Sequence, residues 1–247
     1  MRLIVFDCDG TLVDSQQAIV SATAEAFEVV GVAVPPRVDI LSAVGLPIEV
    51  AMRRHAPEAD DVQIDEILTL YRAAHIRLSQ QSDRGQVLFE GMKEIIEMLG
   101  AEPDTRLGIV TMKSRRGLKR VVDAYGIRNY FAALKSADDG PGKPAPDLLL
   151  DAMAECDVSA DQTVMIGDTS FDMLMAKAAG AYAIGVGWGY QTVDEVVEAG
   201  ADAVNCLAWV IKEVCASAFS ICLYIWHTDC NFDFDLGSLR GDKFTWE

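Results

Sequence analysis

Short apolar runs recur along the chain and predict buried strands, because β-branched and aromatic residues dominate them and small or acidic residues end them. These runs occupy residues 3–6, 107–111, 131–134, 163–168 and 182–186. Between most of them, apolar residues recur at the spacing of a helix. Since strands alternate with helices, the pattern predicts an α/β fold with a parallel, doubly wound sheet.

One block of the chain departs from this alternation. Residues 16–30 have helical spacing, with Ser15 as the expected N-cap and Gly31 as the stop. From residue 37 to about residue 86 there is no strand pattern, and residues 48–55 and 64–81 are amphipathic at helical spacing. We therefore interpret this block as a helical insertion in the sheet.

The C-terminal segment, residues 217–247, has neither a clean period nor a low-complexity composition, and we assign it no role. The longest apolar run, residues 214–226, is too short to predict a membrane span. The sequence therefore gives no reason to expect a membrane protein.

Composition narrows the class of protein and of partner. The chain has 247 residues, of which 51% are hydrophobic and 24% charged, as is typical of a soluble globular protein. Its net charge of −17 repels nucleic acid and anionic membranes, so we expect a small-molecule partner and neither of these. The chain starts directly with a strand and its cysteines lack zinc or CxxC spacing, so we expect a cytoplasmic protein. The sequence does not define an oligomeric state.

Two carboxylates lie where the first strand ends. Asp7 and Asp9 follow the apolar run directly, and ligands of open α/β sheets bind at this edge. Side chains two residues apart on a strand share a face, and two close carboxylates repel unless a cation or a proton lies between them. A hard divalent ion with oxygen ligands meets this need, so the sequence favours Mg²⁺.

The stretch Asp7-Cys8-Asp9-Gly10-Thr11 resembles DxDGT, the first motif of the haloacid dehalogenase superfamily, in the form that its phosphatases use. The other motifs of the family follow in order. They match Thr111, then Lys143 in Gly-Lys-Pro-Ala-Pro-Asp, then Asp168 and Asp172 in Gly-Asp-Thr-Ser-Phe-Asp. The resemblance extends over about residues 3–190 and is most specific in its first and last motifs.

The resemblance implies a role for each matched residue. Asp7 would be the nucleophile that forms an aspartyl phosphate, and Asp9 the general acid and then the general base. Thr111 would bind a phosphoryl oxygen, and Lys143 would neutralise Asp7 and the phosphoryl group. The alternative for Thr111 is an ordinary threonine at a strand end.

The same resemblance implies a Mg²⁺ site. Its ligands would be Asp7, the backbone carbonyl of Asp9, Asp168 and, directly or through another ligand, Asp172. The alternative for Asp172 is a carboxylate in the first turn of a helix, and both roles are compatible.

The family also implies a domain organisation and an activity. Residues 1–15 and 87–216 would form a Rossmann-like core with the haloacid dehalogenase fold, and residues 16–86 a small helical cap. We expect a Mg²⁺-dependent phosphatase of the phosphoglycolate phosphatase-like branch that hydrolyses a small phosphate monoester. The alternatives are a pyrophosphatase, a non-catalytic binding protein, or a phosphosugar mutase. The cap lacks the His-x-x-Thr-x-x-Lys pattern of such mutases, which disfavours the last.

Two groups of basic residues complete the sequence analysis. In the expected cap, one cation is a candidate to pair with a substrate carboxylate, and the group comprises Arg53, Arg54, His55, Arg72, His75 and Arg77. We interpret the second group as a solvated helix face, with guidance of an anionic substrate as the alternative; it comprises Lys113, Arg115, Arg116, Lys119 and Arg120.

Overall fold

A six-stranded parallel sheet forms the centre of the structure. The structure is a computed structural model, and it describes residues 1–80 and 86–205. The strand order is β5-β4-β1-β6-β7-β8, and every neighbouring pair is parallel. The strands are β1 (Arg2–Phe6), β4 (Thr105–Val110), β5 (Phe131–Lys135), β6 (Thr163–Gly167), β7 (Tyr182–Val186) and β8 (Ala203–Asn205). The predicted α/β fold with a parallel, Rossmann-like sheet is thus confirmed.

Both faces of the central strand β1 are covered by helices. Ile4 and Phe6 pack on one face against α5 (Met92–Gly100) and α6 (Arg115–Ala124), whereas Leu3 and Val5 belong to the core on the other face. That second core includes α7 (Asp147–Cys156), α8 (Ser170–Ala179) and a residue of α9 (Val193–Glu198). All four β1 side chains are fully buried, which explains why the run is apolar without alternation.

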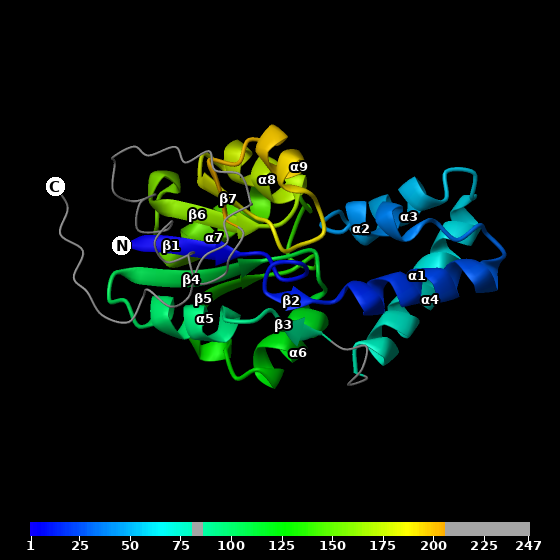
Figure 1. The fold of residues 1–247 in the computed structure, drawn as a ribbon, viewed down its shortest axis with the longest axis horizontal. Helices are drawn as coiled ribbons and strands as arrows, with labels where there is room; N and C mark the ends of the chain where they lie inside the picture. The colour runs from blue at the N-terminus through cyan, green and yellow to red at the C-terminus, as the bar shows by residue number, and fades with distance from the viewer. Residues whose placement is uncertain (81–85, 206–247) are drawn as a thin grey trace, which may run out of the picture.

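Four helices form a separate group beside the sheet, at the end toward which β1 runs (Figure 1). They are α1 (Gln16–Val30), α2 (Arg37–Ser42), α3 (Ile48–His55) and α4 (Asp61–Leu78). Phe27, Ile64 and Ile67 are buried in a core of their own between these helices. Residues 16–80 contain no strand, as expected, while the domain limits at residues 15 and 87 stay a prediction.

Helix α4 begins and ends three residues before the range that its apolar period predicts. The reason for the earlier start is a capping box at its N-terminus. The Gln63 amide donates to Asp60 Oδ1 at 2.9 Å, and the Asp60 amide donates to Gln63 Oε1 at 3.1 Å. These bonds satisfy two amides that the helix itself leaves free.

A small antiparallel sheet was not predicted from the sequence. Strand β2 (Val13–Asp14) pairs with β3 (Val87–Leu88), and so joins the segments on either side of the four-helix group. Strands of two residues are too short to show a period. The remaining elements are two single turns of 3₁₀ helix, η1 (Arg128–Tyr130) and η2 (Ala160–Gln162).

Within the part of the chain that the structure describes, no helix is both long and apolar enough to cross a membrane. The apolar run at residues 214–226, and the tail at 217–247, lie outside the described residues.

Two neighbouring leucines on α7 test this account of the core. Leu149 is fully buried, whereas Leu150 is 44% exposed. We expect Leu149→Ala to lower the free energy of unfolding by about 2–5 kcal/mol, because it leaves a cavity in the core. The control, Leu150→Ala, should change it by about 0.5 kcal/mol or less. Urea denaturation followed by circular dichroism measures both, and equal losses would contradict the burial described here.

Candidate active site

Three adjacent strands bring the predicted site residues to one edge of the sheet. Asp7 follows β1, Thr111 follows β4 and Asp168 follows β6, and these strands are neighbours in the order β4-β1-β6. Because the strands are parallel, their C-terminal ends meet at this edge. The loop before α7 adds Lys143, and the first turn of α8 adds Asp172.

Three buried carboxylates form the centre of the site. Oxygen atoms of Asp7, Asp168 and Asp172 all lie within 4.8 Å of one another, and each residue is 2% exposed or less. Lys143 Nζ lies 2.7 Å from Asp7 Oδ1 and 2.6 Å from Asp172 Oδ1. The ammonium group of Lys143 therefore compensates part of the negative charge of three carboxylates.

The pKa values of this cluster reflect its burial and its excess of negative charge. Burial, then Asp7 and Asp172, hold the pKa of Asp168 well above its usual range. Burial also raises the pKa of Asp7 to about 6, although Lys143 acts to lower it. Burial acts to lower the pKa of Lys143, but Asp172 and Asp7 raise it, so its ammonium group stays charged. A further cation at the cluster would relieve the repulsion between its carboxylates.

The donor set fits Mg²⁺. Carboxylate oxygens are hard ligands of the kind that Mg²⁺ prefers, and no soft sulfur or imidazole donor belongs to the cluster among the described residues. Asp7, Asp168 and Asp172 are the side chains that would hold the ion. The role of each as a ligand remains a prediction.

Asp168 is held in place by contacts from two loops. Thr11 Oγ1 donates to its Oδ1 at 2.9 Å, and the Tyr190 amide donates to its Oδ2 at 2.9 Å. Gly10 and Gly189 pack against it so closely that a Cβ on either would lie 2.2 or 2.1 Å from an atom of Asp168. These two positions require glycine because any side chain would displace the carboxylate.

Asp172 caps a helix, one of the two roles that the sequence allowed, and it also belongs to the acidic cluster. Its Oδ2 accepts hydrogen bonds from the Thr169 amide at 3.1 Å and from Thr169 Oγ1 at 2.7 Å, in a capping box at the start of α8. Its Oδ1 meets Lys143 in the acidic cluster. The helix cap thus fixes the carboxylate that faces the site.

Asp9 has a cation of its own rather than one shared with Asp7. Lys113 Nζ lies 2.7 Å from Asp9 Oδ1, and the Ser15 hydroxyl donates to the same oxygen. Burial acts to raise the pKa of Asp9, but Lys113 and the Ser15 hydrogen bond hold it below its usual range. Strand β1 ends at Phe6, so strand alternation does not place Asp9, yet both carboxylates line the same pocket.

Ser15 is the N-cap residue of α1, as expected, but its side chain does not cap the helix. Its hydroxyl contacts Asp9 and lies 3.1 Å from the Tyr190 hydroxyl instead, and its amide donates to Tyr190 Oη at 2.9 Å.

Lys113 does not belong to a solvated helix face, which corrects the sequence interpretation. It is 6% exposed and lies between the end of β4 and the start of α6, two residues after Thr111. Its amide donates to Thr111 Oγ1 at 3.2 Å. This position next to a strand end is the sequence signal that would have identified it. The other members of the group lie on α6, where Arg115, Arg116 and Lys119 are exposed.

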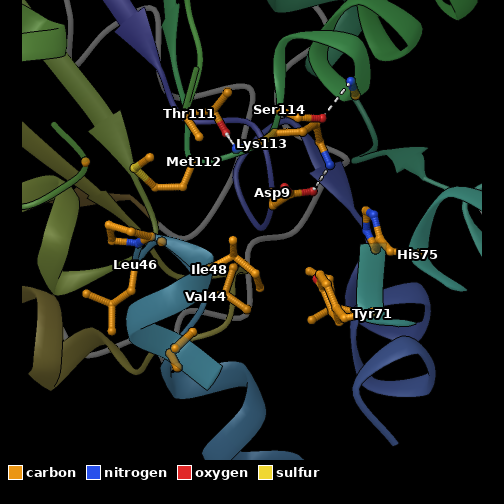
Figure 2. Close-up of a pocket in the computed structure, with 18 of the residues that line it drawn as sticks. Asp9, Val44, Leu46, Ile48, Tyr71, His75, Thr111, Met112, Lys113 and Ser114 are labelled. Atoms are coloured by element: carbon orange, nitrogen blue, oxygen red, sulfur yellow. Dashed lines mark hydrogen bonds and ion pairs between the residues drawn. The ribbon is translucent and has the colours of Figure 1, made fainter. Parts of the chain in front are cut away.

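A pocket of about 500 Å³ lies between this edge of the sheet and the four-helix group. Asp7, Asp9, Thr111 and Lys113 line it from the sheet side. Figure 2 shows the opposite side, where the segment around Leu46 and helix α4 supply the walls. The site is thus a cleft with charged residues on the sheet side and helical residues on the opposite side.

Three of the basic residues expected to face the substrate are paired with acids. Arg53 meets Asp61 at 2.8 Å, Arg72 meets Glu49 at 2.5 Å and Arg77 meets Glu25 at 2.5 Å. The three arginines, Glu49 and Glu25 are about half exposed, and Asp61 is 86% exposed.

Comparison with known proteins places most of the described chain in one family. Residues 4–186 match the family model described as haloacid dehalogenase-like hydrolase. Over 196 residues the chain is 35% identical to the probable phosphatase IndB of Dickeya dadantii. The alignment covers 78% of this chain and 84% of that protein. It is 30% identical over 197 residues to a phosphoglycolate phosphatase of Pseudomonas fluorescens, covering 76% of this chain and 70% of the relative.

Solved structures agree with this assignment. A hydrolase from Pseudomonas syringae superposes with a TM-score of 0.77 at 26% identity, covering 86% of this chain and 97% of that chain.

Magnesium binding tests the acidic cluster without any assay of activity. An ion that binds only the folded chain stabilises it by about 2.7 kcal/mol at about a hundred times its Kd. We expect Mg²⁺ to raise the stability of the wild-type chain in this way, as measured by denaturation with and without the ion. Asp168→Asn should abolish the gain, while Asp161→Asn, at a fully exposed site outside the cluster, should retain it. An unchanged gain in Asp168→Asn would exclude Asp168 as a ligand.

Proposed function

Since the chain belongs to the haloacid dehalogenase-like hydrolase family and to its phosphoglycolate phosphatase-like branch, we propose that it is a Mg²⁺-dependent phosphatase of a small phosphate monoester that acts through an aspartyl phosphate. As a member of this branch it is an enzyme, a phosphoric monoester hydrolase. One observation carries the proposal: Asp7 is buried at the floor of the pocket, paired with Lys143 and next to two further carboxylates.

In the first step, a carboxylate oxygen of Asp7 attacks phosphorus. The bond between phosphorus and the ester oxygen breaks, and the departing alkoxide takes a proton from the carboxyl group of Asp9. Lys143 compensates the charge on Asp7 and the phosphoryl oxygens, and the Thr111 hydroxyl donates to one of these oxygens. Bound Mg²⁺ would supply the remaining positive charge for phosphoryl oxygens in a site this acidic.

Asp9 must be released from Lys113 before it can carry that proton. The two side chains form an ion pair, and both line the pocket. An incoming phosphoryl group competes with Asp9 for the Lys113 ammonium, because both ligands are anionic. Substrate binding would thus free the Asp9 carboxylate, which then takes up a proton from solvent or from a singly protonated phosphoryl group before the first step.

In the second step, Asp9 is the base. It removes a proton from a water molecule, whose oxygen attacks phosphorus while the bond from phosphorus to Asp7 breaks. Inorganic phosphate leaves, Asp7 is again a carboxylate, and Asp9 releases its proton to solvent and pairs again with Lys113. The Ser15 hydroxyl, which contacts Asp9, would hold it in place during this step.

Phosphate release from a panel of esters, assayed with Mg²⁺ and with chelator, tests the activity. We expect release that requires Mg²⁺ and that falls by at least about a thousandfold in Asp7→Asn, which lacks the nucleophile. The panel includes phosphoglycolate and pyrophosphate, so that the pyrophosphatase alternative is tested alongside. Activity that persists in Asp7→Asn would reject Asp7 as the nucleophile.

Asp9→Asn separates the two steps. We expect its turnover to fall by about 10²–10⁴-fold, because the acid and base are lost while the nucleophile remains. Some phosphoryl transfer to Asp7 should persist, so the phosphorylated chain should accumulate and be detectable by intact-mass spectrometry after a rapid quench. Wild-type turnover in this variant would remove Asp9 from the mechanism.

A further inference from the structure

The pocket extends well past the acidic cluster, and its far walls differ in chemistry. One wall is aliphatic. Val44, Leu46 and Ile48, in the segment between α2 and the start of α3, line it and face across the opening in Figure 2. Side chains of this kind bind an apolar surface and offer no hydrogen bond.

The facing wall is aromatic and polar. Tyr71 and His75 lie one turn apart on α4 and stack with their ring centroids 5.6 Å apart and their planes 13° apart. Both line the pocket, and among the described residues neither the hydroxyl nor the imidazole has a hydrogen-bond partner. Both side chains are partly buried, and their polar groups are available to a ligand in the pocket.

The aromatic wall carries no charge at neutral pH. Burial first, and then Lys113, lower the pKa of His75 to about 4. Burial raises the pKa of Tyr71 above its ordinary value. The pair therefore offers neutral donors and acceptors, which suit hydroxyl, carbonyl or ring-nitrogen groups.

The charged residues of the lining include more acids than permanent cations, which disfavours a second anion. Its acids are Asp7, Asp9, Glu49 and Asp138, and its permanent cations are Arg72, Lys113 and Arg120. Arg72 is paired with Glu49 and Lys113 with Asp9. Arg120, on α6, forms no ion pair with any described residue, and its Nη1 is 3.5 Å from the hydroxyl of Ser79 at the end of α4. A phosphoryl group already needs the cations nearest to Asp7.

We propose that the leaving group of the substrate is an uncharged, ring-sized alcohol with an apolar face and hydrogen-bonding groups, such as a sugar or a heterocycle attached to one, and not a carboxylate such as glycolate. A volume of about 500 Å³ has room for such a ring beside the phosphoryl group. The aliphatic wall takes its apolar face, and Tyr71 with His75 bind its polar groups. This inference rests on the proposed phosphatase function and specifies its substrate class.

Matched esters test the charge of the leaving group. Phosphoglycolate and 2-hydroxyethyl phosphate have the same length and differ in a carboxylate against a hydroxymethyl group. We expect kcat/KM to be at least about tenfold higher for 2-hydroxyethyl phosphate, because a second anion meets an acidic lining. Ribose 5-phosphate, which adds an uncharged ring, should exceed both. A preference for phosphoglycolate, or no gain with the ring, would overturn the inference.

A charge placed in the aliphatic wall provides the second test. Leu46→Lys adds a cation facing the pocket, and should reverse the preference between the two matched esters. Val50→Lys adds the same charge on α3 at a position that is 50% exposed and is not part of the lining, and should leave the preference unchanged. If neither variant altered the ratio, charge in this wall would not govern selection.

The phosphatase function and the class of the leaving group can be contradicted by different results. Mg²⁺-dependent release from any ester supports the phosphatase function, whichever ester ranks first. The ranking alone decides the inference on the leaving group. Release from no ester would overturn the function and, with it, this inference.

Discussion

The site depends on one ammonium group that is buried between two carboxylates. Removing ions from water costs several kcal/mol for each, and only close partners offset this cost. Lys143 has two such partners, Asp7 and Asp172, at 2.7 and 2.6 Å, and it is 1% exposed. Among the described residues, Asp168 has no cation at such a distance, and its carboxylate accepts hydrogen bonds from Thr11 and Tyr190. The negative charge of the three carboxylates therefore exceeds the positive charge of Lys143, and this excess attracts a hard cation.

The parallel sheet makes this arrangement possible. Asp7 and Asp168 lie far apart in the sequence, yet they follow neighbouring strands that end at the same edge. Lysines from two different loops then separate the two acids of the first motif, since Lys143 pairs with Asp7 and Lys113 with Asp9. Burial raises the pKa of Asp7 against the effect of Lys143. At Asp9 the effect of burial is outweighed by Lys113 and Ser15, which lower the pKa, so residues two apart have opposite shifts. Neighbouring carboxylates with such different surroundings can perform different steps of one reaction.

The sequence predicted most of the fold because periodicity reports burial directly. Residues 48–55 form a helix with the predicted limits, and the apolar run at 3–6 lies in the central strand. What it missed depends on partners from elsewhere in the chain. The Ser15 side chain contacts Asp9 instead of capping its own helix, and Lys113 resembled a surface lysine until the sheet placed it at the site. Contacts between side chains that are far apart in the sequence leave no local pattern. The family motifs, in contrast, predicted the site residues together.

The charge of the chain and the charge of its ligand are also compatible. A net charge of −17 opposes the approach of a phosphate ester, but exposed charges are screened beyond about 8 Å at physiological salt. Inside the pocket, Lys143 and Lys113 act at hydrogen-bond distance and away from water, where each interaction is stronger. The positive potential is therefore short-ranged and directed at one phosphoryl group. Arg72, the arginine of the helical group that lines the pocket, is paired with Glu49 of a neighbouring helix. A substrate with one anionic end and one neutral end matches this distribution better than a substrate with anions at both ends.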